Sequence, residues 1–146
     1  MPEATFYTHV SDPVKFSIRL VQRALNADSR VLVWAADGEA LAQLDHDFWA
    51  LSPESFLPHQ VWEHSEPYPH EVALVLSAGR LPEKLEQSVT VLNLSPAFWC
   101  DAPELPARVL EIVSDNLDDL AEARNRFRAY HQQGFTITHH NMSGKA

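Results

Sequence analysis

Five apolar residues follow an arginine in the stretch Arg30-Val31-Leu32-Val33-Trp34-Ala35. A run this short, without alternating polar residues, is typical of a strand that is buried on both faces of a parallel sheet. Parallel strands need long crossover connections, which are usually helices. The run therefore predicts an α/β domain with helices on either side of it in the sequence.

Helix signals occur on both sides of this run. Asp12 can act as an N-cap, and Pro13 suits the first helical position that follows it. Asp37 can cap a second helix directly after the run. Residues 4–10 are rich in aromatic and β-branched side chains, which favours a strand. The first third of the chain is thus predicted to form a βαβα unit.

Three more segments are predicted to be strands: residues 72–76, 89–94 and 108–113, although the last of these also fits a helix. Ser114 or Asp115 can open a final helix that runs to about Gln133, with Gly134 suited to its C′ position. We expect a three-layer α/β/α sandwich around a mostly parallel central sheet. Residues 1–138 should form a single domain, followed by a flexible C-terminal tail at residues 139–146.

The charge of the chain limits its partners. Twenty acidic residues outnumber eleven basic ones, for a net charge of −9. Proteins that bind nucleic acid through phosphates need clustered basic residues, so direct nucleic-acid binding is not expected. No apolar run approaches the roughly 20 residues that span a bilayer, and the chain does not start like a signal peptide. The single cysteine, Cys100, fits a reducing compartment. We therefore predict a cytoplasmic protein without membrane contact.

The sequence gives little support for an enzyme. Phosphate loops need closely spaced glycines, whereas the four glycines here are far apart. The expected fold is therefore Rossmann-like without a nucleotide site. The eight histidines lack the usual metal-ligand spacing, and Cys100 is expected to be an inert thiol. We predict no catalytic residues, metal or cofactor. A small nucleotide-binding or hydrolytic α/β enzyme is the alternative.

Two segments need explanation beyond the fold. The first contains Trp49 and Phe56 in a stretch rich in aromatic residues and proline, at the end of the second helix and in the loop beyond. Aromatic side chains on a rigid surface loop are good anchors for a protein partner. The alternative is that both side chains fold back over the edge of the sheet.

The second segment is the final helix, where Leu120, Ala123, Phe127 and Tyr130 form one apolar stripe at helical spacing. Arg124 and Arg128, four residues apart, lie along the flank of this stripe. An apolar surface beside two guanidinium groups suits a short acidic peptide, especially its C-terminal carboxylate. The alternative is that these arginines only complement the helix dipole.

These segments resemble the chi subunit of the bacterial DNA polymerase III holoenzyme. The similarity covers roughly residues 4–138, in family order and at family spacing. It includes four stretches: Ala4-Thr5-Phe6-Tyr7, Arg30-Val31-Leu32-Val33, Phe48-Trp49 with Pro53-Glu54-Ser55-Phe56-Leu57-Pro58-His59, and Arg124 to Tyr130 with Gly134-Phe135.

The resemblance implies a non-catalytic adaptor of the DNA replication machinery. Chi proteins bind the psi subunit of the clamp loader and the acidic C-terminal tail of single-stranded-DNA-binding protein. The psi-binding surface carries over to Trp49 and Phe56. The tail-binding site carries over to Val113, Arg124, Phe127 and Arg128. Phe127 stands where the family has tyrosine, and Arg128 where it has lysine, which keeps an apolar wall and a cation.

Overall fold

The computed structural model describes residues 2–27, 30–35, 37–50, 60–62, 73–78, 89–94 and 107–143, without the side chains at positions 48–50 and 60. Within these residues the chain forms three helices and seven strands. In chain order they are β1 (Glu3–Val10), α1 (Pro13–Asn26), β2 (Arg30–Ala35), α2 (Gly38–Ala50), β3 (Gln60–Val61), β4 (Leu74–Ala78), β5 (Val89–Asn93), β6 (Arg108–Ser114), α3 (Leu117–Gln132) and β7 (Thr136–Asn141).

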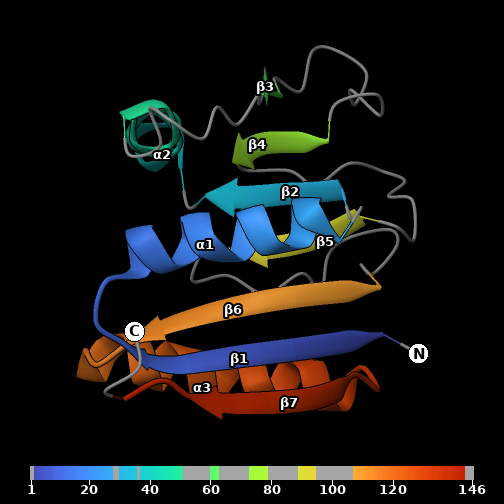
Figure 1. Ribbon diagram of the computed structural model, residues 1–146. Coiled ribbons are helices and arrows are strands. Elements are labelled where there is room, and N and C mark those ends of the chain that lie inside the picture. The colour runs from blue at the N-terminus through green and yellow to red at the C-terminus, as the bar shows by residue number, and fades with distance from the viewer. Residues whose placement is uncertain are drawn as a thin grey trace.

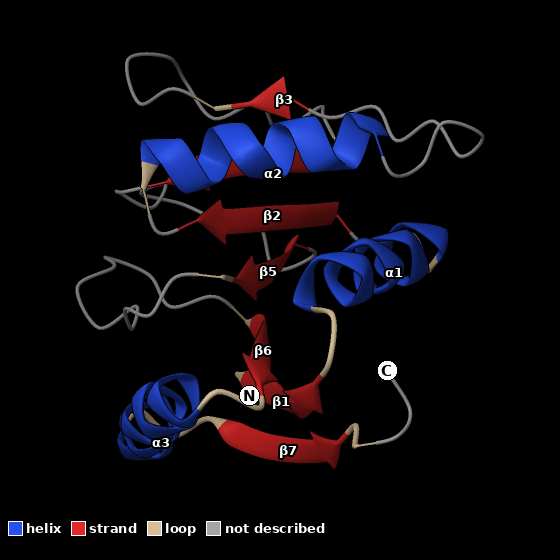
Figure 2. Ribbon diagram, turned by 90° about the vertical axis from the view of Figure 1, so that its left-hand side faces the viewer, coloured by secondary structure: helices blue, strands red, loops and turns tan. Residues whose placement is uncertain are grey.

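The strands form one sheet in the order β3-β4-β2-β5-β6-β1-β7. Every pairing between neighbouring strands is parallel. Helices α1 and α3 cover opposite faces of this sheet (Figure 1 and Figure 2). Helix α2 packs beside β2 and β4, and its Leu44 joins the apolar cluster that contains Phe16 and Val21 of α1. The predicted three-layer sandwich is confirmed, and in the described residues its sheet is parallel throughout.

The direction of the connections explains why α1 and α3 lie on opposite faces. The chain passes from β1 through α1 to β2, towards the β3 edge of the sheet, and from β6 through α3 to β7, towards the other edge. Parallel crossovers are almost always right-handed, so connections that run in opposite directions place their helices on opposite faces.

The central strands bury both of their faces, as the apolar run of β2 predicts. Val31 and Val33 pack in the cluster under α1, whereas Leu32 and Trp34 pack in the cluster on the α3 side. All four side chains are buried. Because side chains alternate between the faces of a strand, a continuous apolar run supplies both clusters at once.

The helix ends follow local chemistry. The Asp12 side chain accepts a hydrogen bond from the backbone N–H of Lys15 at the start of α1. Asp37 accepts one in the same way from Ala40 at the start of α2. The sequence prediction for α3 was one or two residues early, because Asn116 is the N-cap and its side chain accepts from the N–H groups of Asp118 and Asp119.

Helix α3 ends in a left-handed glycine cap at Gly134, as predicted. Gly134 has a φ of 83°, its N–H donates to the carbonyl of His131, and the N–H of Phe135 donates to the carbonyl of Tyr130. The rings of Tyr130 and Phe135 pack edge to face with centroids 5.0 Å apart. Both hydrogen bonds and the apolar contact are those of a Schellman motif. This turn directs the chain from α3 into β7.

The predicted boundary of the C-terminal tail was wrong at residues 139–141. These residues belong to β7, which pairs with β1 from Thr136 to Asn141. The backbone N–H of Met142 also donates to the carbonyl of Thr8. The sequence pattern concealed this strand because β7 lies at an edge of the sheet and is largely exposed, so its residues need not be apolar.

Replacing Gly134 by Ala should lower the free energy of unfolding by about 1–2 kcal/mol, because an L residue resists the left-handed conformation. Chemical denaturation monitored by circular dichroism measures this change. Gly38→Ala is the matched control, since an added Cβ at that helical position would meet no atom within 4 Å. Equal stability of the Gly134→Ala protein and the unsubstituted protein would contradict the role of the cap.

Candidate functional site

A pocket of about 250 Å³ opens between α3, β1 and β7, and we call it the α3–β1 pocket. Its apolar walls are Phe6, Leu120, Ala123 and Phe127. Its polar lining is formed by Thr8, His9, Arg124 and His139. An apolar hollow with a guanidinium group and two imidazoles at its side can hold an apolar side chain next to a carboxylate.

Helix α3 presents part of its sheet-facing stripe to this pocket. Ala123 and Tyr130 are buried against the sheet, and Leu120 packs on the same cluster. Phe127 lies at the margin of the stripe, 43% exposed, with its ring centroid 5.7 Å from that of Phe6. The predicted stripe therefore serves the core at three positions and leaves an accessible aromatic wall at Phe127.

The structure brings together two of the four residues that the family resemblance assigns to tail binding. Arg124 and Phe127 line the α3–β1 pocket. Arg128 is exposed one helical turn further along α3 and does not line the pocket. Val113 is 1% exposed and packs in the same cluster as Ala123, so it supports the pocket from within the core.

The two residues assigned to psi binding cannot be placed in the same way. Trp49 belongs to the last turn of α2, and its side chain lies outside the described residues. Phe56 lies outside them altogether. The two remain a prediction from the resemblance.

Sequence reasoning missed Thr8, His9 and His139 as pocket residues. His9 adopts a left-handed backbone with a φ of 56°, and the pairing of β1 with β6 shifts register between Tyr7 and Val10. Tyr7 and Val10 pack on the α1 side, whereas the consecutive residues Thr8 and His9 both line the pocket on the α3 side. The left-handed conformation costs an L residue about 1–2 kcal/mol. No pattern of residue types in the sequence indicates this backbone conformation.

A buried polar cluster holds α3 against the sheet. The Glu111 carboxylate on β6 is 0% exposed and accepts three hydrogen bonds. These come from Nε of Arg126 at 2.9 Å, the hydroxyl of Tyr130 at 2.6 Å and Nδ2 of Asn93 at 2.7 Å. The cluster thus joins β5, β6 and two successive turns of α3.

Burial raises the pKa of Glu111, and the Arg126 guanidinium and the hydrogen bonds from Tyr130 and Asn93 oppose that effect. Burial also raises the pKa of Tyr130, as does the adjacent Glu111, so the phenol stays protonated and can donate. The three partners are donors, and the Arg126 charge is permanent. Their geometry therefore suits the ionised form of Glu111.

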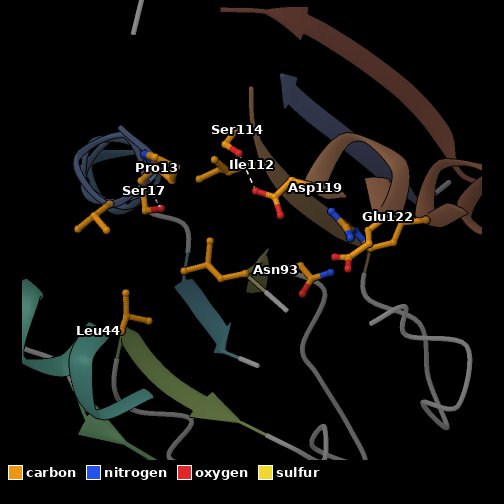
Figure 3. A pocket seen from close by; sticks show the side chains of 11 residues that line it. Pro13, Ser17, Leu44, Asn93, Ile112, Ser114, Asp119 and Glu122 are labelled. Atoms are coloured by element: carbon orange, nitrogen blue, oxygen red, sulfur yellow. Dashed lines mark hydrogen bonds between the residues drawn. The ribbon is translucent and has the colours of Figure 1, made fainter. Parts of the chain in front are cut away.

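A second cavity, of about 380 Å³, lies at the carboxyl ends of β5 and β6 between α1 and α3 (Figure 3). Open α/β sheets commonly bind ligands in this position. Here the α3 side of the cavity carries Asp119, which accepts a hydrogen bond from Ser114, and Glu122. Arg126 also lines it, but Glu111 engages that guanidinium. Phosphates would meet two carboxylates here, which disfavours a nucleotide.

Two features are absent from the described residues, a group of metal ligands and a helix able to span a membrane. No group of three His, Cys, Asp or Glu side chains in that part of the chain could hold a metal ion. None of the described helices has the length and apolar character needed to cross a membrane.

Comparison with known proteins assigns the chain to a family. Residues 1–138 match the family described as DNA polymerase III chi subunit, HolC. The chain belongs to the DNA polymerase III chi subunit family. It is also 28% identical over 147 residues to DNA polymerase III subunit chi of Pseudomonas aeruginosa, across 97% of this chain and 98% of that relative.

Membership of the chi family gives this protein an accessory role in DNA replication, as a protein of the DNA polymerase III assembly. The resemblance drawn from the aromatic segment and the arginine helix is confirmed at the level of the family. Partners within the replication assembly follow from that membership, whereas their identities do not.

Replacing Glu111 by Gln should destabilise this chi-family protein by about 3–5 kcal/mol, because the buried Arg126 charge would lose its counter-charge. Urea unfolding followed by tryptophan fluorescence measures the change. Glu122→Gln provides a control on α3, where an exposed carboxylate is lost and the change should stay within about 0.5 kcal/mol. If both substitutions cost the same, the ion pair does not anchor the helix.

Proposed function

We propose that this chi-family protein is a non-catalytic adaptor that bridges the clamp loader, through the psi subunit, to the C-terminal tail of single-stranded-DNA-binding protein. The observation that carries the proposal is the α3–β1 pocket, in which Phe6 and Phe127 form apolar walls and Arg124 supplies a cation. An acidic peptide with an apolar C-terminal residue complements both features.

The charge of the molecule supports an acidic ligand at this place. The chain has a net charge of −9, yet Arg124, Arg126 and Arg128 fall within five positions of α3. Glu111 pairs with Arg126, while Arg124 and Arg128 are exposed. Arg124 can contact a carboxylate in the pocket, and Arg128 adds positive potential one turn away. In this proposal, Val113 contributes by packing beneath the pocket rather than by touching the tail.

The psi subunit is proposed to bind elsewhere, at Trp49 and Phe56. Trp49 belongs to α2, which packs beside β2 and β4, whereas α3 packs against β6 and β7. Figure 1 shows α2 and α3 towards opposite edges of the sheet. Surfaces that are separated in this way allow both partners to bind together, as a bridge requires. We place this activity in the cytoplasm, with neither nucleic acid nor membrane as a direct partner.

Arg124→Glu should weaken binding of a peptide copy of the single-stranded-DNA-binding protein tail by more than about tenfold. A lost charge-assisted contact costs about 1.5–3 kcal/mol, and a repelling carboxylate adds to that cost. Fluorescence anisotropy with a labelled peptide measures the affinity. Binding should also weaken as salt is added, because the site is open to solvent.

Arg128→Glu is the matched control, since it makes the same charge change one turn away and outside the pocket. We expect a smaller loss of affinity that added salt largely removes. Equal losses from the two variants would point to general charge attraction, and unchanged binding by Arg124→Glu would refute the pocket as the tail site.

Phe56→Ala should prevent co-purification with the psi subunit while leaving tail-peptide affinity unchanged, because the proposed psi-binding site loses a large apolar anchor. Co-expression with psi and affinity purification provide the measurement. Retention of psi by the variant would contradict the assignment, and a parallel loss of peptide binding would indicate that the variant is misfolded.

A further inference from the structure

We infer that His9 is a ligand-contacting residue of the α3–β1 pocket and that its imidazole, together with Arg124, takes the terminal carboxylate of the bound peptide. This inference rests on the proposed function of the pocket. It adds a residue that neither the arginine helix nor the aromatic segment contains, and it makes binding dependent on a proton.

The backbone of β1 is distorted at the point that places His9 in the pocket. A regular strand would send Thr8 and His9 to opposite faces of the sheet. The left-handed conformation at His9, with a φ of 56°, instead directs both side chains towards the pocket. Strained backbone conformations of non-glycine residues tend to occur at functional sites. Here the strain coincides with the wall of a cavity and brings an imidazole to it.

The His9 ring is also held in one orientation. Its Nδ1 lies 2.7 Å from Oδ1 of Asp115, in the turn between β6 and α3. A carboxylate accepts hydrogen bonds, so Nδ1 carries the hydrogen, and Nε2 is the ring nitrogen left for a ligand. Among the described residues, Asp115 is the hydrogen-bond partner of this ring. The arrangement fixes the ring before a ligand arrives.

The protonation state then decides what the ring can bind. In neutral His9, Nε2 is an acceptor and cannot pair with a carboxylate. In the imidazolium form, Nε2–H donates, and the positive charge adds to that of Arg124. Binding of a carboxylate therefore favours uptake of a proton. Affinity should therefore be higher at low pH and fall as the pH rises.

Within the described part of the chain, three charged or titratable side chains face His9. Asp115 faces it from the turn after β6, Arg124 from α3 and His139 from β7. The α1 residues that are described do not line the pocket. Nε2 of His139 forms a hydrogen bond with the hydroxyl oxygen of Thr8, at 2.7 Å. Because His139 brings a second imidazole to the pocket, its contribution must be separated from that of His9 by experiment.

The test compares the unsubstituted 146-residue chain with its His9→Asn, His9→Gly and His139→Asn variants. Asparagine and glycine both tolerate a left-handed backbone, so neither substitution at position 9 should unfold β1. The probe is the labelled tail peptide with a free C-terminal carboxylate, and a copy amidated at the C-terminus. Affinities are measured from pH 6 to pH 8 at constant ionic strength.

We expect the affinity of the unsubstituted protein for the free-acid peptide to fall with rising pH, by at most tenfold per pH unit for one linked proton. Both His9 variants should bind at least about tenfold more weakly at pH 6, as suits loss of one charged hydrogen bond, and should approach the unsubstituted protein at pH 8. The amidated peptide should show neither effect. His9→Gly should melt no lower than the unsubstituted protein, because glycine relieves the strain.

Four results would overturn the inference. Unchanged affinity and pH dependence in both His9 variants would show that His9 does not contact the ligand. If only His139→Asn removed the pH dependence, the linked proton would belong to His139 rather than to His9. Absence of any peptide binding by the unsubstituted protein would overturn the proposed function and this inference together, whereas binding that needs Arg124 but not His9 would overturn only the inference.

Discussion

The buried carboxylate of Glu111 is the interaction on which the arrangement of the other elements depends. It lies on β6 and receives hydrogen bonds from Asn93 on β5 and from Arg126 and Tyr130 on α3. Because Arg126 cannot lose its charge, removal of the carboxylate would leave an ion in the core. The same ion pair fixes the rotation of α3 about its axis. That rotation turns Arg124 and Phe127 towards β1, where the pocket forms.

The chi family membership and the pocket give complementary information about the protein. The family places the chain in the DNA polymerase III assembly. In the proposed function, the pocket is the physical means by which a chain whose net charge is −9 recognises an acidic partner. A guanidinium group beside apolar walls favours a ligand that carries both a carboxylate and an apolar side chain. The phosphates of a nucleic acid would pair with the guanidinium group but would leave the apolar walls without a partner. This selectivity favours a peptide over nucleic acid.

The sequence predicts the fold where local chemistry and periodicity agree. The apolar run of β2, the Asp12-Pro13 start of α1 and the Gly134 end of α3 each depend on a few adjacent residues. The positions of Arg124 and Phe127 on one side of α3 follow from helical spacing in the same way. Contacts between residues far apart in the sequence cannot be predicted in this way, because they depend on how the elements are aligned. Glu111 contacts Tyr130, which lies 19 positions further along the chain. His9 reaches the pocket through an irregularity of the backbone, which no residue pattern indicates. Strand β7 escaped prediction because an exposed edge strand lacks an apolar pattern.

The short turn between α3 and β7 has a consequence for how this chain can vary in evolution. Ile137 packs on the α3 side of the sheet, and His139 lines the pocket on that same side, while His140 stacks on Tyr7 on the other. Side chains of a strand alternate, so insertion or deletion of a single residue in the turn would exchange these two sets. Homologous chains that keep the pocket should therefore conserve the length of this turn more strictly than the identity of the residues that follow it.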